Sequence, residues 1–301
     1  MDREDGIMDR KVDVIIPVYR PTEYLMSLFY MLDRQTLKPD RVIVINTERK
    51  YWDAFFEGYD VLSRYPFIEL HHINKEEFNH GLTRNMGVNL SDTDLFLMMT
   101  NDAVPKDEHL IEKLARNFDD PSTGISYARQ LPHKGCSVIE KYTRGFNYPP
   151  ERIVKGKNEI KTMGIKAFYA SNVCSMYRRE VFDRLGGFTK TDFNEDMIYA
   201  RRMIESGYMI VYEPEACVYH SHDYSGIEQF RRNYDLGRSH ALHPEIFEDI
   251  RSENEGIKLV KSTAVYLLKH FMPLHVIKLI YLSGMKFLGY KCGRKGITFN
   301  K

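Results

Sequence analysis

The stretch Asp-Leu-Phe-Leu-Met-Met-Thr-Asn-Asp-Ala-Val-Pro, residues 94–105, decides the fold of this chain. Residues 95–99 form an unbroken apolar run, which is typical of a strand buried on both faces of a parallel sheet. Small polar residues and Pro105 end the run and place Asp102 directly after the strand. Ligands of open α/β sheets bind outside the carboxyl ends of the strands, so we expect Asp102 to meet a cation or a polar ligand. The alternative is a turn or helix-capping aspartate.

Strands and helices alternate on both sides of this stretch. Apolar runs predict further strands, and apolar residues at helical spacing predict helices between them. The expected strands are 12–18, 41–45 and 67–73, and the expected helices are 24–32, 51–62, 81–90 and 107–118. This alternation predicts right-handed βαβ units, a parallel sheet and a Rossmann-like nucleotide-binding layer.

The pattern is less regular after residue 120. We expect strands at 125–129, 167–176 and 209–212 and helices at 178–185 and 195–206, and a loop facing the substrate at 130–166. The prediction is therefore an α/β fold. A domain over residues 1–224 has a nucleotide-binding half (10–120) and an acceptor half (121–224), and a helical, basic extension over residues 225–301 follows it.

Composition excludes several classes of protein. The chain has 301 residues, is 43% hydrophobic and 28% charged, and its formal net charge of +1 gives no general reason to expect nucleic-acid binding. No Gly-x-Gly-x-x-Gly follows the first strand, and no Gly-x-x-x-x-Gly-Lys-Ser/Thr occurs. A nicotinamide dehydrogenase and a P-loop ATPase are therefore disfavoured.

The sequence also bears on location. The four cysteines form no Cys-x-x-Cys pair, which favours free thiols in a reducing compartment over a zinc site. The charged residues 1–6 do not resemble a signal peptide, and no apolar run of about 18 residues predicts a membrane span. We expect a cytoplasmic protein.

The last part of the chain is basic and partly apolar. Residues 257–301 contain no Asp or Glu, and lysines alternate there with Ile, Leu, Met and Phe. Such an amphipathic segment can lie in a membrane interface, which predicts peripheral attachment to the inner face of the cell membrane. The alternative is a terminal helix packed on the core with a solvated cationic face.

Several short motifs occur in a distinctive order. They are residues 14–19 (Val-Ile-Ile-Pro-Val-Tyr), 78–85 (Phe-Asn-His-Gly-Leu-Thr-Arg-Asn), 100–105 (Thr-Asn-Asp-Ala-Val-Pro), 185–188 (Leu-Gly-Gly-Phe) and 194–196 (Asn-Glu-Asp). Together they resemble the inverting family-2 glycosyltransferases with the GT-A fold, and among these the bacterial rhamnosyltransferase-like enzymes of cell-surface polysaccharide synthesis. The resemblance covers about residues 11–240. It implies transfer of a sugar from a nucleoside diphosphate, with dTDP-rhamnose or a UDP-hexose as donor, to a glycan or lipid-linked acceptor.

The resemblance also implies a metal site. The family usually carries Asp-x-Asp at the end of the fourth strand, and here Thr100 stands at the first position and Asp102 at the second. Asp102 would hold a divalent cation, Mn²⁺ or Mg²⁺, on the diphosphate. A hard cation prefers several oxygen ligands, so further ligands must come from the diphosphate and from a late histidine. We favour His222 over His220 because it lies further into its loop, and the alternative for both is a strand end facing solvent.

The reaction needs a carboxylate that deprotonates the attacking hydroxyl. Asp196 matches the base position of the family, and Glu195 is the candidate for binding acceptor hydroxyls because adjacent helix residues face about 100° apart. The alternative for both is favourable interaction with the positive end of their helix. Arg129 and Gln130, at the end of the fifth strand, are expected to bind the acceptor.

Residues for the nucleotide follow from the same resemblance. They are Pro17, Tyr19, Arg20, Asn46, His80, Arg84, Asn101 and Asp102. Tyr19 and Arg20 would hold the base and ribose, and the guanidinium of Arg84 suits phosphate or base carbonyls. Asn46 is either a base contact or a turn residue.

Two other functions remain open at this point. A nucleotidyltransferase would normally show a glycine-rich loop after the first strand, and residues 18–21 contain no glycine. A non-catalytic sugar-nucleotide-binding protein on a membrane would not need Asp102, Glu195 and Asp196. Residues 229–233 (Gln-Phe-Arg-Arg-Asn) lack the tryptophan of the Gln-x-x-Arg-Trp motif in processive synthases, which favours a single addition.

Overall fold

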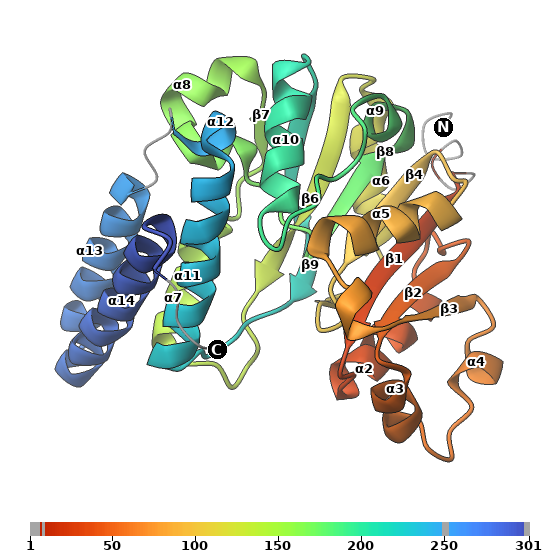
Figure 1. Ribbon diagram of the computed structural model, residues 1–301, viewed down its shortest axis with the longest axis horizontal. Coiled ribbons are helices and arrows are strands. Elements are labelled where there is room, and N and C mark those ends of the chain that lie inside the picture. Colours follow the sequence, from red (N-terminus) through yellow and green to blue (C-terminus); the bar gives the residue numbers. More distant parts are fainter. Residues whose placement is uncertain (1–6, 8–9, 249–252, 298–301) are drawn as a thin grey trace.

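The computed structural model describes residue 7 and residues 10–248 and 253–297. Within them, nine strands form one sheet in the order β3-β2-β1-β4-β8-β6-β9-β5, and β7 pairs with β9 (Figure 1). The strands are β1 (Val12–Tyr19), β2 (Val42–Thr47), β3 (Ile68–Ile73), β4 (Leu95–Met99), β5 (Val104–Pro105), β6 (Thr123–Leu131), β7 (Ile153–Lys155), β8 (Cys174–Arg178) and β9 (Met209–Tyr219).

Helices cover both faces of this sheet (Figure 1). They are α2 (Glu23–Asp33), α3 (Arg49–Phe55), α4 (Val61–Arg64), α5 (His80–Leu90), α6 (Leu110–Arg116), α7 (Val138–Asn147), α8 (Ile160–Met163), α9 (Arg179–Arg184), α10 (Glu195–Glu205), α11 (Gly226–Leu242), α12 (Pro244–Phe247), α13 (Glu253–Lys269) and α14 (Pro273–Arg294).

The first half of the sheet is parallel, as the alternating pattern predicts. β3, β2, β1 and β4 run in the same direction. Beyond β4 the sheet is mixed, because β8 runs antiparallel to both β4 and β6, while β6 and β9 are parallel. Two reversals restore the direction, so β6 and β9 end at the same edge of the sheet as β1, β2 and β4.

Alternate residues of β1 pack against helices on opposite faces. Val14 and Ile16 belong to a core that includes Leu28 of α2. Ile15 belongs to a second core that includes Val88 of α5 and other residues of α5, α9 and α10. Because both faces are covered, residues 14–16 of β1 form an unbroken apolar run. Burying each such side chain contributes about 1.5–3 kcal/mol.

The structure corrects the expectation for residues 130–166. This segment is not an irregular loop, since it contains α7, β7 and α8. Ser137 caps α7, its hydroxyl accepting from the Glu140 amide, and β7 is too short for a period to be recognised. The strand expected at 167–176 is β8, which begins only at Cys174, because residues 164–168 form a 3₁₀ helix whose buried apolar side chains imitate a strand pattern. The helix expected at 51–62 is two short helices, α3 and α4.

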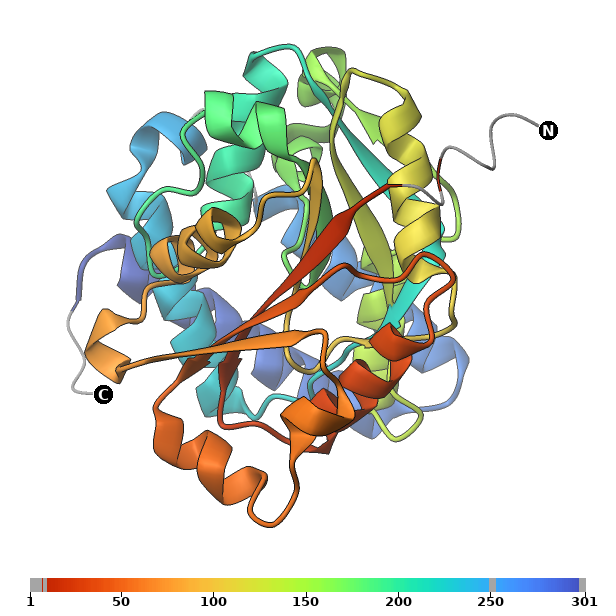
Figure 2. The ribbon, with the colours of Figure 1, turned by 90° about the vertical axis from the view of Figure 1, so that its right-hand side faces the viewer.

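The C-terminal helices α11, α13 and α14 lie at the end of the molecule away from β1, β2 and β3 (Figures 1 and 2). α14 packs tightly on α11: a Cβ added to Gly289 would lie 2.2 Å from the carbonyl oxygen of Phe230, and one added to Gly293 would lie 2.1 Å from that of Tyr234. None of the helices in the described segments is long and apolar enough to cross a bilayer. The start of the expected domain (residues 1–6) and the end of the expected extension (residues 298–301) lie outside the described residues.

Candidate active site

One edge of the sheet gathers many of the candidate residues. Tyr19 and Asn46 lie at the ends of β1 and β2, Asp102 follows β4, Gln130 is near the end of β6, and His220 follows β9. These strands run in the same direction, so their carboxyl ends meet at this edge. This is where α/β sheets bind their ligands.

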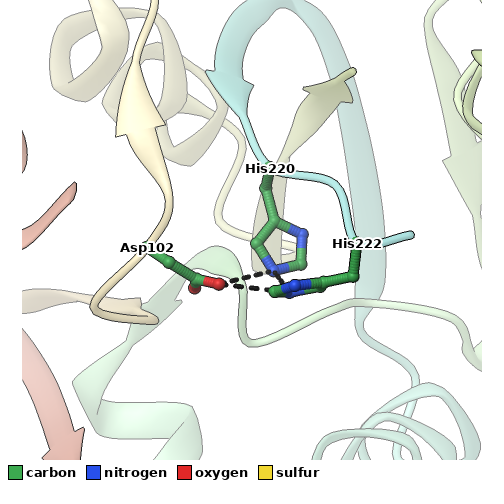
Figure 3. Close-up of side chains that lie close together, drawn as sticks. All are labelled: Asp102, His220 and His222. Carbon is green, nitrogen blue, oxygen red and sulfur yellow. Dashed lines mark hydrogen bonds and ion pairs between the residues drawn. The ribbon is translucent and has the colours of Figure 1, made fainter. Parts of the chain in front are cut away.

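Asp102, His220 and His222 form a compact group of potential metal ligands (Figure 3). Nε2 of His222 lies 3.1 Å from Oδ2 of Asp102, and Nε2 of His220 lies 3.6 Å from the same oxygen. The two Nε2 atoms are 3.1 Å apart. The short strand β5, two residues after Asp102, pairs with the end of β9, so Val104 registers with Tyr219. That pairing carries the Asp102 turn to the histidines.

The electrostatics of this group favour an anionic carboxylate beside neutral imidazole. Burial opposes ionisation of Asp102, but a hydrogen bond from His222 and the neighbouring His220 lower its pKa well below the usual range. Burial lowers the pKa of His220 to about 3, and so this imidazole is neutral. Nδ1 of His220 lies 3.0 Å from Oε1 of Gln130, which also accepts a hydrogen bond from Arg144. Since that oxygen can only accept, His220 donates from Nδ1 and keeps the Nε2 lone pair for a metal.

Two carboxylates lie at the start of α10. Both contact Asn172, whose amide N–H donates to Oδ2 of Asp196 (3.2 Å) and whose side-chain amide donates to Oε1 of Glu195 (2.9 Å). Nη1 of Arg84 lies 3.3 Å from the same Glu195 oxygen. Although burial opposes it, Arg84, His80 and Asn172 together lower the pKa of Glu195. Burial and the adjacent Glu195 raise the pKa of Asp196 to about 7, which is the range of a general base.

Two asparagines of the α5 region hold the loop that leads into α10. Asn79 donates to Oδ1 of Asp192 (3.1 Å), while Asn85 donates to the carbonyl of Phe188 (2.8 Å) and accepts from its amide (2.9 Å). A Cβ on Gly81 would lie 1.9 Å from a carbonyl oxygen of this loop. The motifs at 78–85 and 185–188 are thus packed together, and their contacts position the carboxylates of α10.

His80 and Arg84 are part of this same contact. Nη1 of Arg84 lies 3.3 Å from Nδ1 of His80 and donates to the backbone carbonyl oxygen of His80 (3.1 Å). Burial lowers the pKa of His80. Nε of Arg84 is buried and has no hydrogen-bond partner among the described residues. The structure therefore brings both residues to Glu195, while one guanidinium donor remains open.

The ends of β1 and β2 form the other side of the site. The ring of Tyr19 meets that of Tyr51 edge-on at 5.5 Å, and Arg20 donates to the Tyr51 hydroxyl (3.1 Å). Nδ2 of Asn46 lies 2.9 Å from Nδ1 of His72, and Oδ1 of Asn46 is buried without a hydrogen-bond partner among the described residues. Asn46 therefore lies at the end of a strand rather than in a turn, with a buried side chain.

The remaining candidates are spread along the same edge. Pro17 is half-buried in β1, opposite Ile45 of β2, and Asn101 is half-buried in the turn after β4. Nε of Arg129 donates to the carbonyl oxygen of Tyr148 (3.1 Å).

Sequence reasoning missed two features of this site. Asn172 lies just before β8 and touches both carboxylates of α10, and the polar pair Ser171-Asn172 within an apolar stretch was the available signal. The second is the contact of Gln130 with His220 and Arg144. The side chain of Gln130, which we expected to bind the acceptor, is 3% exposed, and its oxygen contacts these two residues. Nothing in the local sequence shows that contact.

Comparisons with known proteins agree with this geometry. Residues 13–186 match the model of the family "Glycosyl transferase family 2". The chain is 37% identical to the O-antigen chain rhamnosyltransferase RfbN of Salmonella typhimurium, over 94% of this chain and 90% of that protein. It is 35% identical to the O-antigen chain rhamnosyltransferase WbaN of Salmonella anatum, over 93% of this chain and 88% of the relative.

Solved structures show the same fold at low identity. The mannosyltransferase PcManGT from Pyrobaculum calidifontis, in complex with GDP-Man and Mn²⁺, aligns with a TM-score of 0.63 at 12% identity and covers 96% of this chain and 88% of its own. S. aureus TarS 1-349 in complex with UDP-GlcNAc aligns with a TM-score of 0.51 at 14% identity, over 95% and 91% of the two chains. The fold is that of the GT-A glycosyltransferases, and the chain belongs to glycosyltransferase family 2.

Proposed function

We propose that this glycosyltransferase moves rhamnose, with inversion, from a nucleoside diphosphate to a glycan or lipid-linked saccharide of a surface polysaccharide. The observation that carries the proposal is one sheet edge holding both an Asp-His-His group and a buried carboxylate whose pKa is raised to about 7. Departure of a diphosphate and deprotonation of a hydroxyl need these two features. The relatives RfbN and WbaN, named as O-antigen chain rhamnosyltransferases, support the choice of sugar.

The nucleotide would bind across the ends of β1, β2 and β4. Tyr19 and Arg20 would supply an aromatic ring and a cation for the base and ribose, and Asn46 lies beside them at the end of β2. The donor in this proposal is a dTDP- or UDP-sugar. Pro17 and Asn101 would border the same space, and Arg84 of α5 would add its positive charge beside the diphosphate.

Asp102, His220 and His222 would hold a divalent cation, for which Mn²⁺ suits the mixed nitrogen and oxygen ligands. The fit rests on the neutral His220, whose Nδ1 is engaged by Gln130. A bound cation would supply a Lewis acid for the diphosphate as negative charge develops there. We therefore give Gln130 the role of orienting His220 rather than that of binding the acceptor.

Asp196 is the proposed general base. Its raised pKa leaves it able to accept a proton from an acceptor hydroxyl near neutral pH. Glu195, held anionic by Arg84, would accept a hydrogen bond from a second hydroxyl of the acceptor, and Arg129 would lie on the acceptor side. The nucleotide half would thus be residues 10–120 and the acceptor half 121–224.

The C-terminal helices would attach this enzyme to the cytoplasmic face of the membrane. Large apolar side chains of α13, α14 and the turn between them are exposed, among them Phe271 (93%), Leu274 (76%) and Ile277 (66%). Exposed lysines flank them on both helices, and residues 257–297 contain no acid. Exposed apolar side chains surrounded by lysines are suited to binding an anionic lipid surface. Each lysine close to that surface contributes about 1 kcal/mol to the binding free energy.

The direct test incubates the full chain with a panel of dTDP-, UDP- and GDP-sugars, Mn²⁺ and a lipid-linked saccharide acceptor, and measures the products by mass spectrometry. We expect transfer from dTDP-rhamnose. Transfer from none of the donors, or release of pyrophosphate from a nucleoside triphosphate and a sugar phosphate, would contradict the proposal and indicate binding alone or a nucleotidyltransferase.

A further inference from the structure

Three cations from three helices face one another beside the Asp-His-His group. They are Arg144 on α7, Arg232 on α11 and Lys286 on α14, and the charges of both arginines act on Lys286. One carboxylate acts on Lys286, that of Glu140, and its Oε1 lies 2.6 Å from Nε of Arg144. We call the three cations the basic triad.

Contacts connect the basic triad to the active site at two points. Arg144 donates to the same Gln130 oxygen that accepts from His220. The guanidinium of Arg232 lies 4.7 Å from the centre of the Tyr224 ring, and that ring stacks on His222 at 4.9 Å. The triad therefore borders the place where the diphosphate of the donor would lie.

Lys286 is the member without a partner. Its side chain is half-buried, and its Nζ makes no hydrogen bond or ion pair with the residues the structure describes. α14 packs tightly on α11 where Gly289, three residues after Lys286, meets the carbonyl of Phe230, two residues before Arg232. Burial, Arg144 and Arg232 lower the pKa of Lys286, and Glu140 opposes them. Placing an unpaired ammonium beside two guanidinium groups is costly unless an anion joins them.

We propose that Lys286, together with Arg232, binds a phosphoryl group, so that the C-terminal helix α14 contributes directly to substrate binding. The inference rests on the proposed function and adds a residue outside the segment that matches the family model. The ligand chemistry is a phosphate ester, and it has two sources: the diphosphate of the donor or the phosphate of a lipid-linked acceptor. An ammonium and a guanidinium suit either one.

The test compares Lys286→Gln with Lys38→Gln, a change at an exposed lysine in the loop between α2 and β2. Calorimetry with dTDP and with UDP, each in Mn²⁺ and in EDTA, measures nucleotide affinity and so tests the donor diphosphate. The KM for a lipid-linked acceptor tests the acceptor phosphate. We expect Lys286→Gln to weaken one of the two by about tenfold or more. Weaker nucleotide binding identifies the donor, and a raised acceptor KM with unchanged nucleotide binding identifies the acceptor. Lys38→Gln should change neither, and Lys286→Arg should restore most of the affinity.

Unchanged nucleotide binding and unchanged acceptor KM in Lys286→Gln would overturn the inference. Should Lys286→Gln fail to fold, Arg232→Gln, at an exposed position, provides the same comparison. Nucleotide binding is measured without turnover, so it separates this inference from the proposed reaction. Wild-type chain that binds dTDP but transfers no sugar contradicts the reaction and leaves the phosphate site testable.

Discussion

Nη1 of Arg84 on α5 lies 3.3 Å from Oε1 of Glu195 on α10, and the two side chains are 8% and 7% exposed. This buried pair joins α5, in the parallel part of the fold, to the start of α10, which carries both carboxylates. Arg84 lowers the pKa of Glu195 against the effect of burial, and burial and the Glu195 carboxylate raise the pKa of Asp196 while Arg84 opposes them. One ion pair therefore contributes to two properties, the stability of the interface between the halves and the basicity of Asp196.

Arg84→Gln should destabilise the protein. It leaves the Glu195 carboxylate buried without its cation, which costs about 3–5 kcal/mol. The free energy of unfolding in urea at pH 8 measures the loss. Arg49→Gln removes an exposed ion pair with Asp53 and should change stability by less than about 1 kcal/mol. Equal losses in the two variants would show that the Arg84 pair does not stabilise the fold.

Asp196→Asn should abolish transfer while leaving the nucleotide site intact. We expect kcat to fall by about 10²-fold or more, because a general base typically contributes 10²–10⁴-fold, and dTDP affinity to stay near that of the wild type. Steady-state kinetics and calorimetry make the comparison. Glu205→Gln, at the other end of α10, serves as the control. Near-normal kcat in Asp196→Asn would exclude this residue as the base.

Activity should rise with pH through the neutral range. The pKa of Asp196 is about 7, so below this pH the carboxylate is protonated and cannot accept the hydroxyl proton. A profile of kcat/KM for the acceptor should show an acidic limb at about this pH, far above the usual range of aspartate. In Arg84→Gln the uncompensated Glu195 anion should shift this limb to higher pH. A limb near pH 4 would show that another group is titrating.

Asp196→Asn should also stabilise the protein at alkaline pH. A folded-state pKa above the unfolded value of about 3.8 means that stability is lost as pH rises through the folded pKa, because the buried carboxyl must ionise. The asparagine variant avoids that loss. We expect its melting temperature to exceed that of the wild type at pH 8.5 and the difference to shrink at pH 5. A difference independent of pH would have another origin.

Removing ligands or their support should weaken metal binding. His222→Ala and Asp102→Ala each remove a ligand, and Gln130→Leu removes the acceptor that orients His220, for which a loss of about 10–100-fold is typical. Calorimetric titration with Mn²⁺ in the absence of donor measures the affinity directly. His275→Ala, an exposed histidine on α14, should bind as the wild type does. Undiminished Mn²⁺ affinity in Asp102→Ala would place the metal elsewhere.

The paired change Phe271→Ser and Leu274→Ser should reduce binding to anionic vesicles. Both side chains are exposed at the turn between α13 and α14, so the fold should be unaffected. Co-sedimentation with vesicles at low and high salt gives the measurement, and salt should weaken binding because it screens the lysines. Tyr59→Ser, exposed elsewhere, is the control. If the wild-type chain does not bind vesicles but dimerises at high concentration, the membrane prediction is wrong and this face binds a second copy of the chain.

The sequence alone determined the parallel half of the sheet and the position of Asp102. A buried strand can be predicted from local sequence, because an apolar run indicates a segment covered on both faces. The residue that follows the run, here near Asp102, is then placed at the end of the strand. The Asn-Glu-Asp motif likewise locates two carboxylates at the start of a helix. The resemblance to family 2 rests on such local motifs, and the family match confirms it.

Only the tertiary structure decided which of these groups meet. β5 pairs with the end of β9 and brings His220 as well as His222 to Asp102, and α5 brings Arg84 to Glu195. Glu195 and Asp196 are adjacent carboxylates in the sequence, yet burial and a cation beside only one of them shift their pKa values in opposite directions. Strand pairing, burial and charge proximity depend on chain segments far apart in the sequence. No local pattern of residues encodes them, and they bring the motif residues together into one group of potential metal ligands and one buried carboxylate pair.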